Sequence, residues 1–149
     1  MSGVSPRPSR IHGTGLFAER AFAPGEIVAV YHGPVVSDSP APDAQGRIHA
    51  MELSPGRWID GSGADNLARH ANHSCDPNTD AVPAGDVVRL VARRQISAGD
   101  EVTFDYGFGL ADALDHRCRC GAPGCPGRIV AEPLRAALRR HLPPQKPRD

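Results

Sequence analysis

The residues best suited to chemistry are concentrated in one stretch of the chain, residues 66–78. These thirteen residues include three Asn, two His, one Cys and one Pro. Asn, Ser and Asp favour helix caps and turns, because their side chains bond nearby backbone groups. The same side chains donate and accept the hydrogen bonds that hold a polar ligand. The stretch alone therefore predicts either a capped turn or a ligand site.

Three of the four cysteines of the chain fall within residues 118–125, in the pattern Cys-x-Cys-x4-Cys. Two cysteines one residue apart cannot bridge each other without strained disulfide geometry, so we favour zinc over disulfides. A structural zinc ion takes four ligands in a tetrahedron. His116 is an alternative for the fourth ligand. The expected ligands are Cys75, Cys118, Cys120 and Cys125.

Two short apolar runs lead into a tyrosine. Residues 27–31 read Ile-Val-Ala-Val-Tyr, and residues 101–107 read Glu-Val-Thr-Phe-Asp-Tyr-Gly. Both patterns predict strands, and alternation in the second places Val102, Phe104 and Tyr106 on one face. As bare patterns they are core strands, in which a tyrosine is a half-buried residue with a polar tip.

A loop with two glycines lies near the N-terminus, in His12-Gly13-Thr14-Gly15. Glycine is placed where backbone turns tightly or approaches a ligand, but a lone Gly-x-Gly is better explained by an ordinary turn. Hydrolase oxyanion loops share the His-Gly-x-Gly pattern, but the chain has no Gly-x-Ser-x-Gly nucleophile motif.

Short elements are expected to position these residues. Residues 87–92 are expected to form a central strand and residues 58–60 a brief one, whereas residues 34–57 show little periodicity. Residues 67–71 suit a helical turn capped by Asp65 or Asn66.

A second helix is expected near the C-terminus, over residues 131–142. Leu134, Leu138 and Leu142 recur there at i, i+4 and i+8, which is typical of an amphipathic helix. The tail beyond it is expected to be frayed. It carries Lys146, the only lysine of the chain.

Composition limits the classes of protein. A chain of 149 residues with 16 Gly and 15 Pro suits one domain of short strands and turns. The 17 basic and 17 acidic residues cancel, so we expect no direct nucleic-acid ligand. The sequence shows neither the apolar core of a signal peptide nor a membrane span, so a cytoplasmic location is expected.

Taken together, the motifs resemble those of SET-domain protein-lysine methyltransferases. Asn-x-x-Arg at residues 66–69 followed by Asn-His-Ser-Cys-x-Pro-Asn at residues 72–78 is similar to the central signature of that family. Phe-Asp-Tyr-Gly at residues 104–107 is similar to its third signature, and the Gly-x-Gly loop to its first. The cysteines of residues 118–125 are similar to its post-SET segment, whose zinc site the Cys of Asn-His-Ser-Cys completes.

This resemblance implies roles for particular residues. Tyr106 and Tyr31 would be catalytic, and Phe104 lies where the family exchanges Phe and Tyr to set how many methyl groups are added. Phe leaves room, so di- or trimethylation is expected. The residues implied to bind S-adenosylmethionine are His12, Gly13, Thr14, Gly15, Asn72, His73 and Tyr106.

The resemblance also implies a fold: mainly β, with several small curved sheets, a C-terminal pseudoknot, few short helices and a zinc-bound post-SET segment. We expect a flexible lead-in at residues 1–9, a SET domain at 10–110, the post-SET segment at 111–130, and a short helix with a frayed tail at 131–149. Nine residues leave no room for a cysteine-rich segment before the domain, so a minimal SET plus post-SET unit is expected.

The implied function is methyl transfer from S-adenosylmethionine to a lysine ε-amine of a protein substrate. The alternative is a catalytically idle, zinc-stabilised protein-interaction module. A zinc hydrolase that uses His70 and His73 is a further alternative, but these two residues lack a third ligand in an identifiable pattern. The substrate protein and the oligomeric state do not follow from the sequence.

Overall fold

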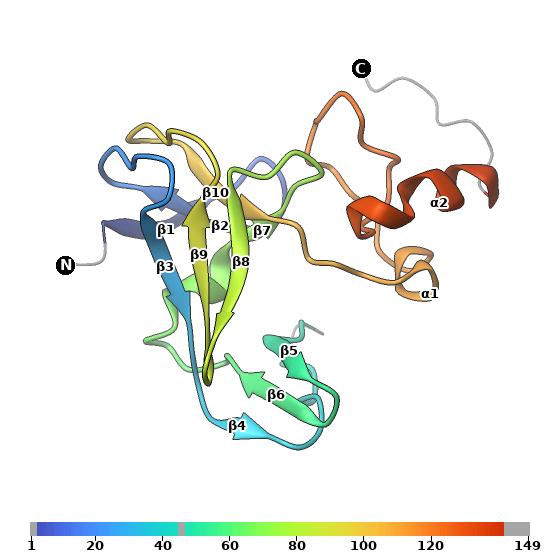
Figure 1. Ribbon diagram of the computed structural model, residues 1–149, viewed down its shortest axis with the longest axis horizontal. Coiled ribbons are helices and arrows are strands. Elements are labelled where there is room, and N and C mark those ends of the chain that lie inside the picture. Colours follow the sequence, from blue (N-terminus) through green and yellow to red (C-terminus); the bar gives the residue numbers. More distant parts are fainter. Residues whose placement is uncertain (1–2, 45–46, 142–149) are drawn as a thin grey trace.

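The computed structural model describes residues 3–44 and 47–141. Within these residues the chain is mainly β, with short strands in three small sheets and only brief helical segments (Figure 1). The sheets lie on one side of the molecule and the C-terminal helices on the other (Figure 1). The expected mainly β fold of several small sheets with few helices is confirmed. No described helix has the length and apolar character needed to span a membrane.

The first sheet carries most of the signature residues and has the strand order β1, β2, β10, β7. Its strands are β1 (Val4–Pro8), β2 (Thr14–Ala18), β10 (Glu101–Phe104) and β7 (Asn72–His73). β10 runs antiparallel to β2 and parallel to β7, with Phe104 opposite His73. The sheet therefore brings the glycine loop, the central signature and the third signature together.

The expectation of a flexible lead-in at residues 1–9 is wrong for most of that segment. β1 pairs with the full length of β2, from Val4 opposite Ala18 to Pro8 opposite Thr14. The strand was not predicted because it contains two prolines, which are excluded from central strands. Proline is tolerated at a sheet edge, where β1 lies. The connection of this hairpin is residues 9–13, so His12 and Gly13 of the glycine loop lie in the turn, whereas Thr14 and Gly15 begin β2.

The second sheet has the order β3 (Ile27–Tyr31), β9 (Val87–Ala92), β8 (Thr79–Ala84). β9 is central, which confirms the strand predicted at residues 87–92. β8 was not predicted, because most of its residues are exposed and it contains Pro83. Both features suit an edge strand.

The third sheet has the order β4 (Val35–Val36), β6 (Arg57–Asp60), β5 (Ala50–Ser54). It confirms the brief strand expected at residues 58–60 and adds two strands in the segment that showed little periodicity. Only Ile59 of these strands is fully buried, so the apolar alternation that marks a half-buried strand is weak here.

The helical turn expected after Asp65 is the 3₁₀ turn η1 (Leu67–His70). Asn66 occupies the capping position, but its side chain makes no capping hydrogen bond. Instead Asn66 Nδ2 donates to the Gly61 carbonyl oxygen at 2.9 Å, and Asn66 Oδ1 accepts from the His32 amide at 3.3 Å. The predicted cap is therefore wrong, and Asn66 joins two loops.

The main apolar core lies between the sheets. β10 ends at Phe104, so the strand is shorter than the alternating pattern suggested, and Tyr106 packs against the core from beyond its end. The buried members of this core are Val4, Leu16, Ala18, Phe22, Val28, Tyr31, Ile59, Ala68, Ala71, Val88, Leu90, Ala92, Ile96, Val102 and Phe104.

Residues 108–141, here called the C-terminal unit, pack around a second and much smaller core of Ala113, Val130 and Leu138. Its helical segments are α1 (Leu110–Ala113), the 3₁₀ turn η2 (Glu132–Leu134) and α2 (Arg135–His141). The predicted helix thus begins as a 3₁₀ turn, and Leu138 lies on its buried side. Leu142 and the tail with Lys146 lie outside the described residues.

Candidate functional site

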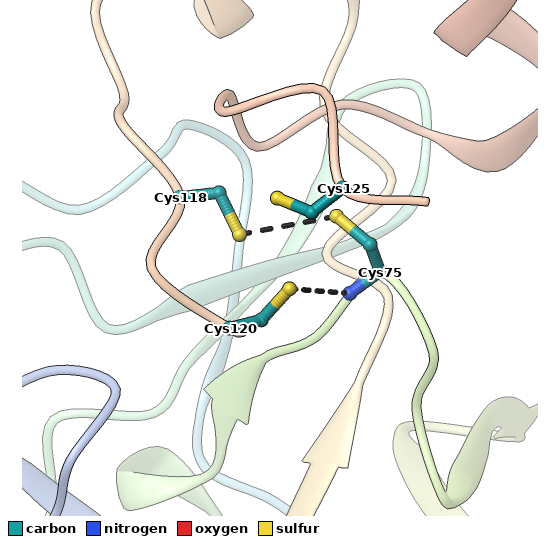
Figure 2. A group of neighbouring side chains, drawn as sticks. All are labelled: Cys75, Cys118, Cys120 and Cys125. Carbon is teal, nitrogen blue, oxygen red and sulfur yellow. Dashed lines mark hydrogen bonds between the residues drawn. The ribbon is translucent and has the colours of Figure 1, made fainter. Parts of the chain in front are cut away.

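Four cysteine sulfurs meet where the central signature faces the C-terminal unit (Figure 2). Cys75 follows β7, and the other three come from the loop of residues 118–125. All four Sγ atoms lie within 4.8 Å of one another, and those of Cys75 and Cys118 are 3.8 Å apart. Among the described residues this is the one group of three or more side chains able to hold a metal ion.

The sulfur spacing fits a bound ion. A tetrahedron with Zn–S bonds of about 2.3 Å separates its sulfurs by about 3.8 Å, whereas a disulfide requires about 2.05 Å. Among the described residues none of the four cysteines is joined in a disulfide. The alternative ligand His116 turns its Nδ1 to the Asp112 carbonyl oxygen at 2.8 Å and does not join the group.

Backbone amides surround the sulfurs. The amides of Cys75 and Ala122 donate to Cys120 Sγ at 3.4 and 3.5 Å, and the Gly127 amide donates to Cys125 Sγ at 3.4 Å. Hydrogen bonds from Cys118 hold the pKa of Cys120 far below its ordinary value and lower the pKa of Cys125 to about 6. A hydrogen bond with Cys118 raises the pKa of Cys75, and one with Cys120 raises the pKa of Cys118, so without a cation only the sulfurs of Cys120 and Cys125 favour the charged form.

His73 stands between the cluster and the third signature. Its Nδ1 accepts a hydrogen bond from the Tyr106 backbone amide at 3.0 Å, and its Nε2 lies 3.4 Å from Cys75 Sγ. Burial lowers the pKa of His73, although the Asp105 carboxylate, 3.8 Å from Nδ1, opposes this shift. Because Nδ1 accepts the hydrogen of the Tyr106 amide, Nδ1 carries no proton, and the hydrogen bond requires an uncharged imidazole ring.

An open cavity of about 560 Å³ is lined by residues from all three sheets. Tyr31 at the end of β3, Phe104 at the end of β10, and Tyr106 beyond it are among its walls. The structure thus brings the two predicted catalytic tyrosines and the predicted specificity residue together. Other walls come from β5, β6 and the start of the C-terminal unit, with Trp58 and Phe108 among them.

Tyr31 is held in place by close contact with backbone. A Cβ added at Gly61 would lie 2.3 Å from Tyr31 Oη, so only glycine fits there without displacing the ring. Asn66 joins the Gly61 carbonyl oxygen to the His32 amide, next to Tyr31 in the chain. Burial raises the pKa of Tyr31 well above its ordinary value, so its hydroxyl stays protonated.

Tyr106 is fixed by both its backbone and its hydroxyl. The hydroxyl donates to the Ala71 carbonyl oxygen at 2.7 Å, and the ring packs 4.8 Å from the Phe104 ring between centroids. Burial raises the pKa of Tyr106 well above its ordinary value. Because its proton is directed to Ala71, the oxygen lone pairs remain to accept a hydrogen bond from another group.

The glycine loop is anchored by Asn72. Asn72 Nδ2 donates to the His12 carbonyl oxygen and to Glu101 Oε1, each at 2.9 Å, and lies 3.1 Å from Ser9 Oγ. The side-chain nitrogen of Asn72, one of the residues implied to bind the cofactor, is thus used within the protein. Neither residues 12–15, Asn72 nor His73 line the cavity. The predicted residues form two groups, joined where Tyr106 contacts His73 and Ala71.

Several residues of the site were missed by sequence reasoning. Glu101 accepts from Ser9 Oγ at 2.7 Å as well as from Asn72, and a Cβ at Gly15 would clash with it. Its one visible sign is a charged residue in an otherwise buried strand. Two carboxylates, Glu52 and Asp112, line the cavity from elements that carry no recognisable motif.

Comparison with known proteins places these features in a family. The model of the SET domain matches residues 13–107. A histone-lysine N-methyltransferase, H3 lysine-36 specific, of Emericella nidulans is 36% identical over 129 residues, covering 78% of this chain and 13% of that protein. The histone-lysine N-methyltransferase trr of Drosophila melanogaster is 34% identical, covering 78% of this chain and 5% of the relative.

A plant relative covers more of its own length. The histone-lysine N-methyltransferase ASHH3 of Arabidopsis thaliana is 29% identical over 138 residues, covering 85% of this chain and 38% of that protein. The chain therefore spans well under half the length of these curated relatives. The family model covers most of the chain, including both groups of predicted residues except His12, and the chain belongs to the SET-domain family.

Proposed function

We propose that the protein transfers methyl groups from S-adenosylmethionine to lysine ε-amines of a protein substrate. The observation that carries this proposal is the cavity where Tyr31, Phe104 and Tyr106 meet in a SET domain. The relatives named above are histone-lysine N-methyltransferases, which supports a protein substrate.

The reaction needs a neutral lysine amine, because a protonated amine has no lone pair to attack a methyl group. With an ordinary pKa of about 10.4, only about one amine in a thousand is neutral at pH 7.4, equivalent to about 4 kcal/mol. Aromatic walls such as Trp58 and Phe108 withdraw the amine from water, which lowers its pKa. The cavity therefore helps to prepare the nucleophile.

The tyrosines orient the amine rather than deprotonate it. Both hydroxyls have raised pKa values, so neither is an anionic base at physiological pH. The Tyr106 hydroxyl donates a hydrogen bond to the Ala71 carbonyl oxygen. Its oxygen accepts a hydrogen bond from the amine, which aims the nitrogen lone pair. Orientation of this kind accounts for a large share of enzymatic acceleration.

The glycine loop and Asn72 are proposed to hold the cofactor, which supplies an electrophilic methyl group on a sulfonium when bound. Gly13 adopts φ +44°, and nothing lies within 4 Å of the position a Cβ would take. Open space beside an anchored backbone suits a ligand that lies against the main chain. The proposed cofactor residues are His12, Gly13, Thr14, Gly15, Asn72, His73 and Tyr106.

We propose that the four cysteines hold one structural Zn²⁺, which makes residues 111–130 a post-SET segment. The sulfur spacing and a group made up of four cysteines support zinc. The ion would join β7 to the C-terminal unit and take no part in the chemistry.

Phe104 is proposed to set the number of methyl groups. A phenylalanine here leaves a site without a hydroxyl that would hold the amine or a water in place of a methyl group, so dimethyl or trimethyl product is expected. Mass spectrometry that finds only monomethyl-lysine after extended reaction would contradict this role.

The competing function is an idle interaction module. It predicts that S-adenosylmethionine leaves the thermal unfolding temperature of the protein unchanged, whereas the proposed enzyme is stabilised according to its affinity for the cofactor.

The direct test is methyl transfer from labelled S-adenosylmethionine by purified, reduced protein to core histones or to a cell lysate. Label is expected on lysine. Tyr106→Phe should lower turnover about a hundredfold with cofactor affinity nearly unchanged, because it removes one orienting hydroxyl. Cofactor binding without transfer to any lysine, or unaltered turnover in Tyr106→Phe, would contradict the proposal.

A further inference from the structure

We propose that His73 is a positioning residue that couples the metal centre to Tyr106. The proposal rests on the proposed function, since it concerns the catalytic tyrosine and the ion held by the four cysteines. It assigns to the His73 side chain a role distinct from cofactor binding. The proposal is based on the contacts of the two ring nitrogens: Nδ1 faces the Tyr106 backbone amide, and Nε2 faces Cys75 Sγ.

The hydrogen bonds define which nitrogen carries the proton. The Tyr106 backbone amide is a donor, so His73 Nδ1 at 3.0 Å must be its unprotonated acceptor. A neutral imidazole then carries its proton on Nε2, which lies 3.4 Å from Cys75 Sγ. Nε2 therefore donates to the sulfur, and a metal-bound thiolate is a stronger acceptor than a thiol.

The surroundings hold the ring in this orientation. His73 is 2% exposed, and its backbone pairs with β10 opposite Phe104. The Tyr106 ring meets the imidazole edge to face, with centroids 5.4 Å apart. A buried ring fixed by a strand on one side and an aromatic face on the other transmits a displacement of Cys75 to the Tyr106 backbone.

The consequence reaches the reacting group. The Tyr106 amide is held by His73, and the Tyr106 hydroxyl is held by Ala71, two residues before His73. A shift of the imidazole therefore moves the hydroxyl that aims the amine. Groups that bond to metal ligands in this way typically change metal affinity by about 10- to 100-fold when they are replaced.

Two substitutions separate the two bonds. In His73→Asn the amide oxygen replaces Nδ1 and keeps an acceptor for Tyr106, but the donor to Cys75 is lost. In His73→Gln the amide nitrogen replaces Nε2 and keeps that donor, but the acceptor is lost. His70→Gln is the matched control, because His70 is partly exposed on η1 and does not line the cavity.

We expect His73→Asn to lose metal to a chelator about 10- to 100-fold more readily than wild type and, once loaded with metal, to show the smaller loss of turnover of the two variants. His73→Gln should keep its metal but lose turnover by about a hundredfold. The control should change neither. Equal effects of both His73 variants on both quantities, or no effect of either, overturns the proposal.

A measurement on the wild-type protein tests the same proposal without relying on the folding of a variant or on an activity assay. In ¹⁵N-labelled, metal-loaded protein, a scalar coupling is expected across the hydrogen bond between the Tyr106 amide nitrogen and His73 Nδ1. Metal removal should weaken it, while the Thr103 amide, 2.9 Å from Asn78 Oδ1, stays protected from exchange. A coupling that is absent, or unchanged by metal removal, overturns the proposal even if methyl transfer is confirmed.

Discussion

The sheets and the C-terminal unit are stabilised by different forces. Among the described residues, the sheets and the turns between them share an apolar core of fifteen buried side chains, whereas the apolar core of the C-terminal unit has three. A segment this small seldom folds on apolar burial alone and usually needs a metal or disulfides. The four cysteines lie where the unit meets the sheets, which suits an ion that supplies the missing stability.

This difference shows that the cavity is built partly by the large core of the sheets and partly by residues next to the C-terminal unit. Tyr31 and Phe104 belong to the large core, so the cavity floor is built without the metal. Tyr106 lies beyond the last strand, between that core and the cysteine cluster, and depends on both. On the proposed mechanism, the reacting geometry would combine a rigid wall with one residue, Tyr106, whose position the proposed metal centre would influence.

The largest expected effect comes from Cys118→Ser, which removes one metal ligand. Because the binding free energy of a structural zinc ion is of the order of 10 kcal/mol, the C-terminal unit should lose its structure and turnover should fall more than a hundredfold. Circular dichroism should still show the sheets. Arg119→Ser, an exposed neighbour, is the control and should retain both metal and turnover.

The next largest effect comes from the same substitution, Leu→Ala, made once in each of the two cores. Leu90 in the sheets and Leu138 in the C-terminal unit are 0% and 1% exposed. Leu90→Ala should lower the free energy of global unfolding by about 2–5 kcal/mol, the usual range for such cavities. Leu138→Ala should leave the unfolding of the sheets unchanged within about 0.5 kcal/mol, because its core is separate. Denaturant titration checks both, and equal losses would show one shared core.

A smaller effect is expected from Gly61→Ala. The new Cβ would overlap the Tyr31 ring, and such overpacking typically costs about 1–3 kcal/mol. Turnover should fall about tenfold with metal content unchanged. Gly63→Ala, whose Cβ would meet only the exposed Asp65 carboxylate, should be neutral. Equal turnover in the two variants would show that the Tyr31 position does not matter.

The smallest expected effect is that of tyrosine ionisation on kcat/KM. Below pH 10 it should not be detectable. Because burial raises the pKa of both Tyr31 and Tyr106, neither hydroxyl loses its proton there. The value of kcat/KM should therefore rise about tenfold per pH unit from 7 to 9, following the neutral fraction of the lysine substrate. A decline beginning near pH 9 would instead assign a titrating tyrosine to the mechanism.

The sequence alone predicted the parts of the fold that are marked by a distinctive local pattern of residues. The cysteine spacing led to the four sulfurs that meet, and the apolar run at residues 87–92 led to the central strand. Tyr31 and Tyr106, 75 positions apart in the chain, were linked only by resemblance, and the structure places both on one cavity.

The rest depends on tertiary contacts that local pattern does not encode. β1 and β8 are edge strands with proline, so propensity opposed them. Asn66 was expected to cap a turn, but it bonds His32 and Gly61, which no periodicity brings near it. The His73 bridge was invisible for the same reason, because it exists only when β7 lies beside β10.

Hydrogen exchange before and after metal removal tests most directly the claim that the two regions are held by different forces. The probes in the C-terminal unit are the Cys118 and Ile129 amides, each bonded at 3.0 Å to the facing segment. The probes in the sheets are the Ala92 and Thr103 amides, bonded to Glu26 and Asn78. Metal removal should accelerate exchange at the first pair more than a hundredfold and leave the second pair unchanged within about twofold. Equal acceleration at both pairs, or at neither, would contradict the account.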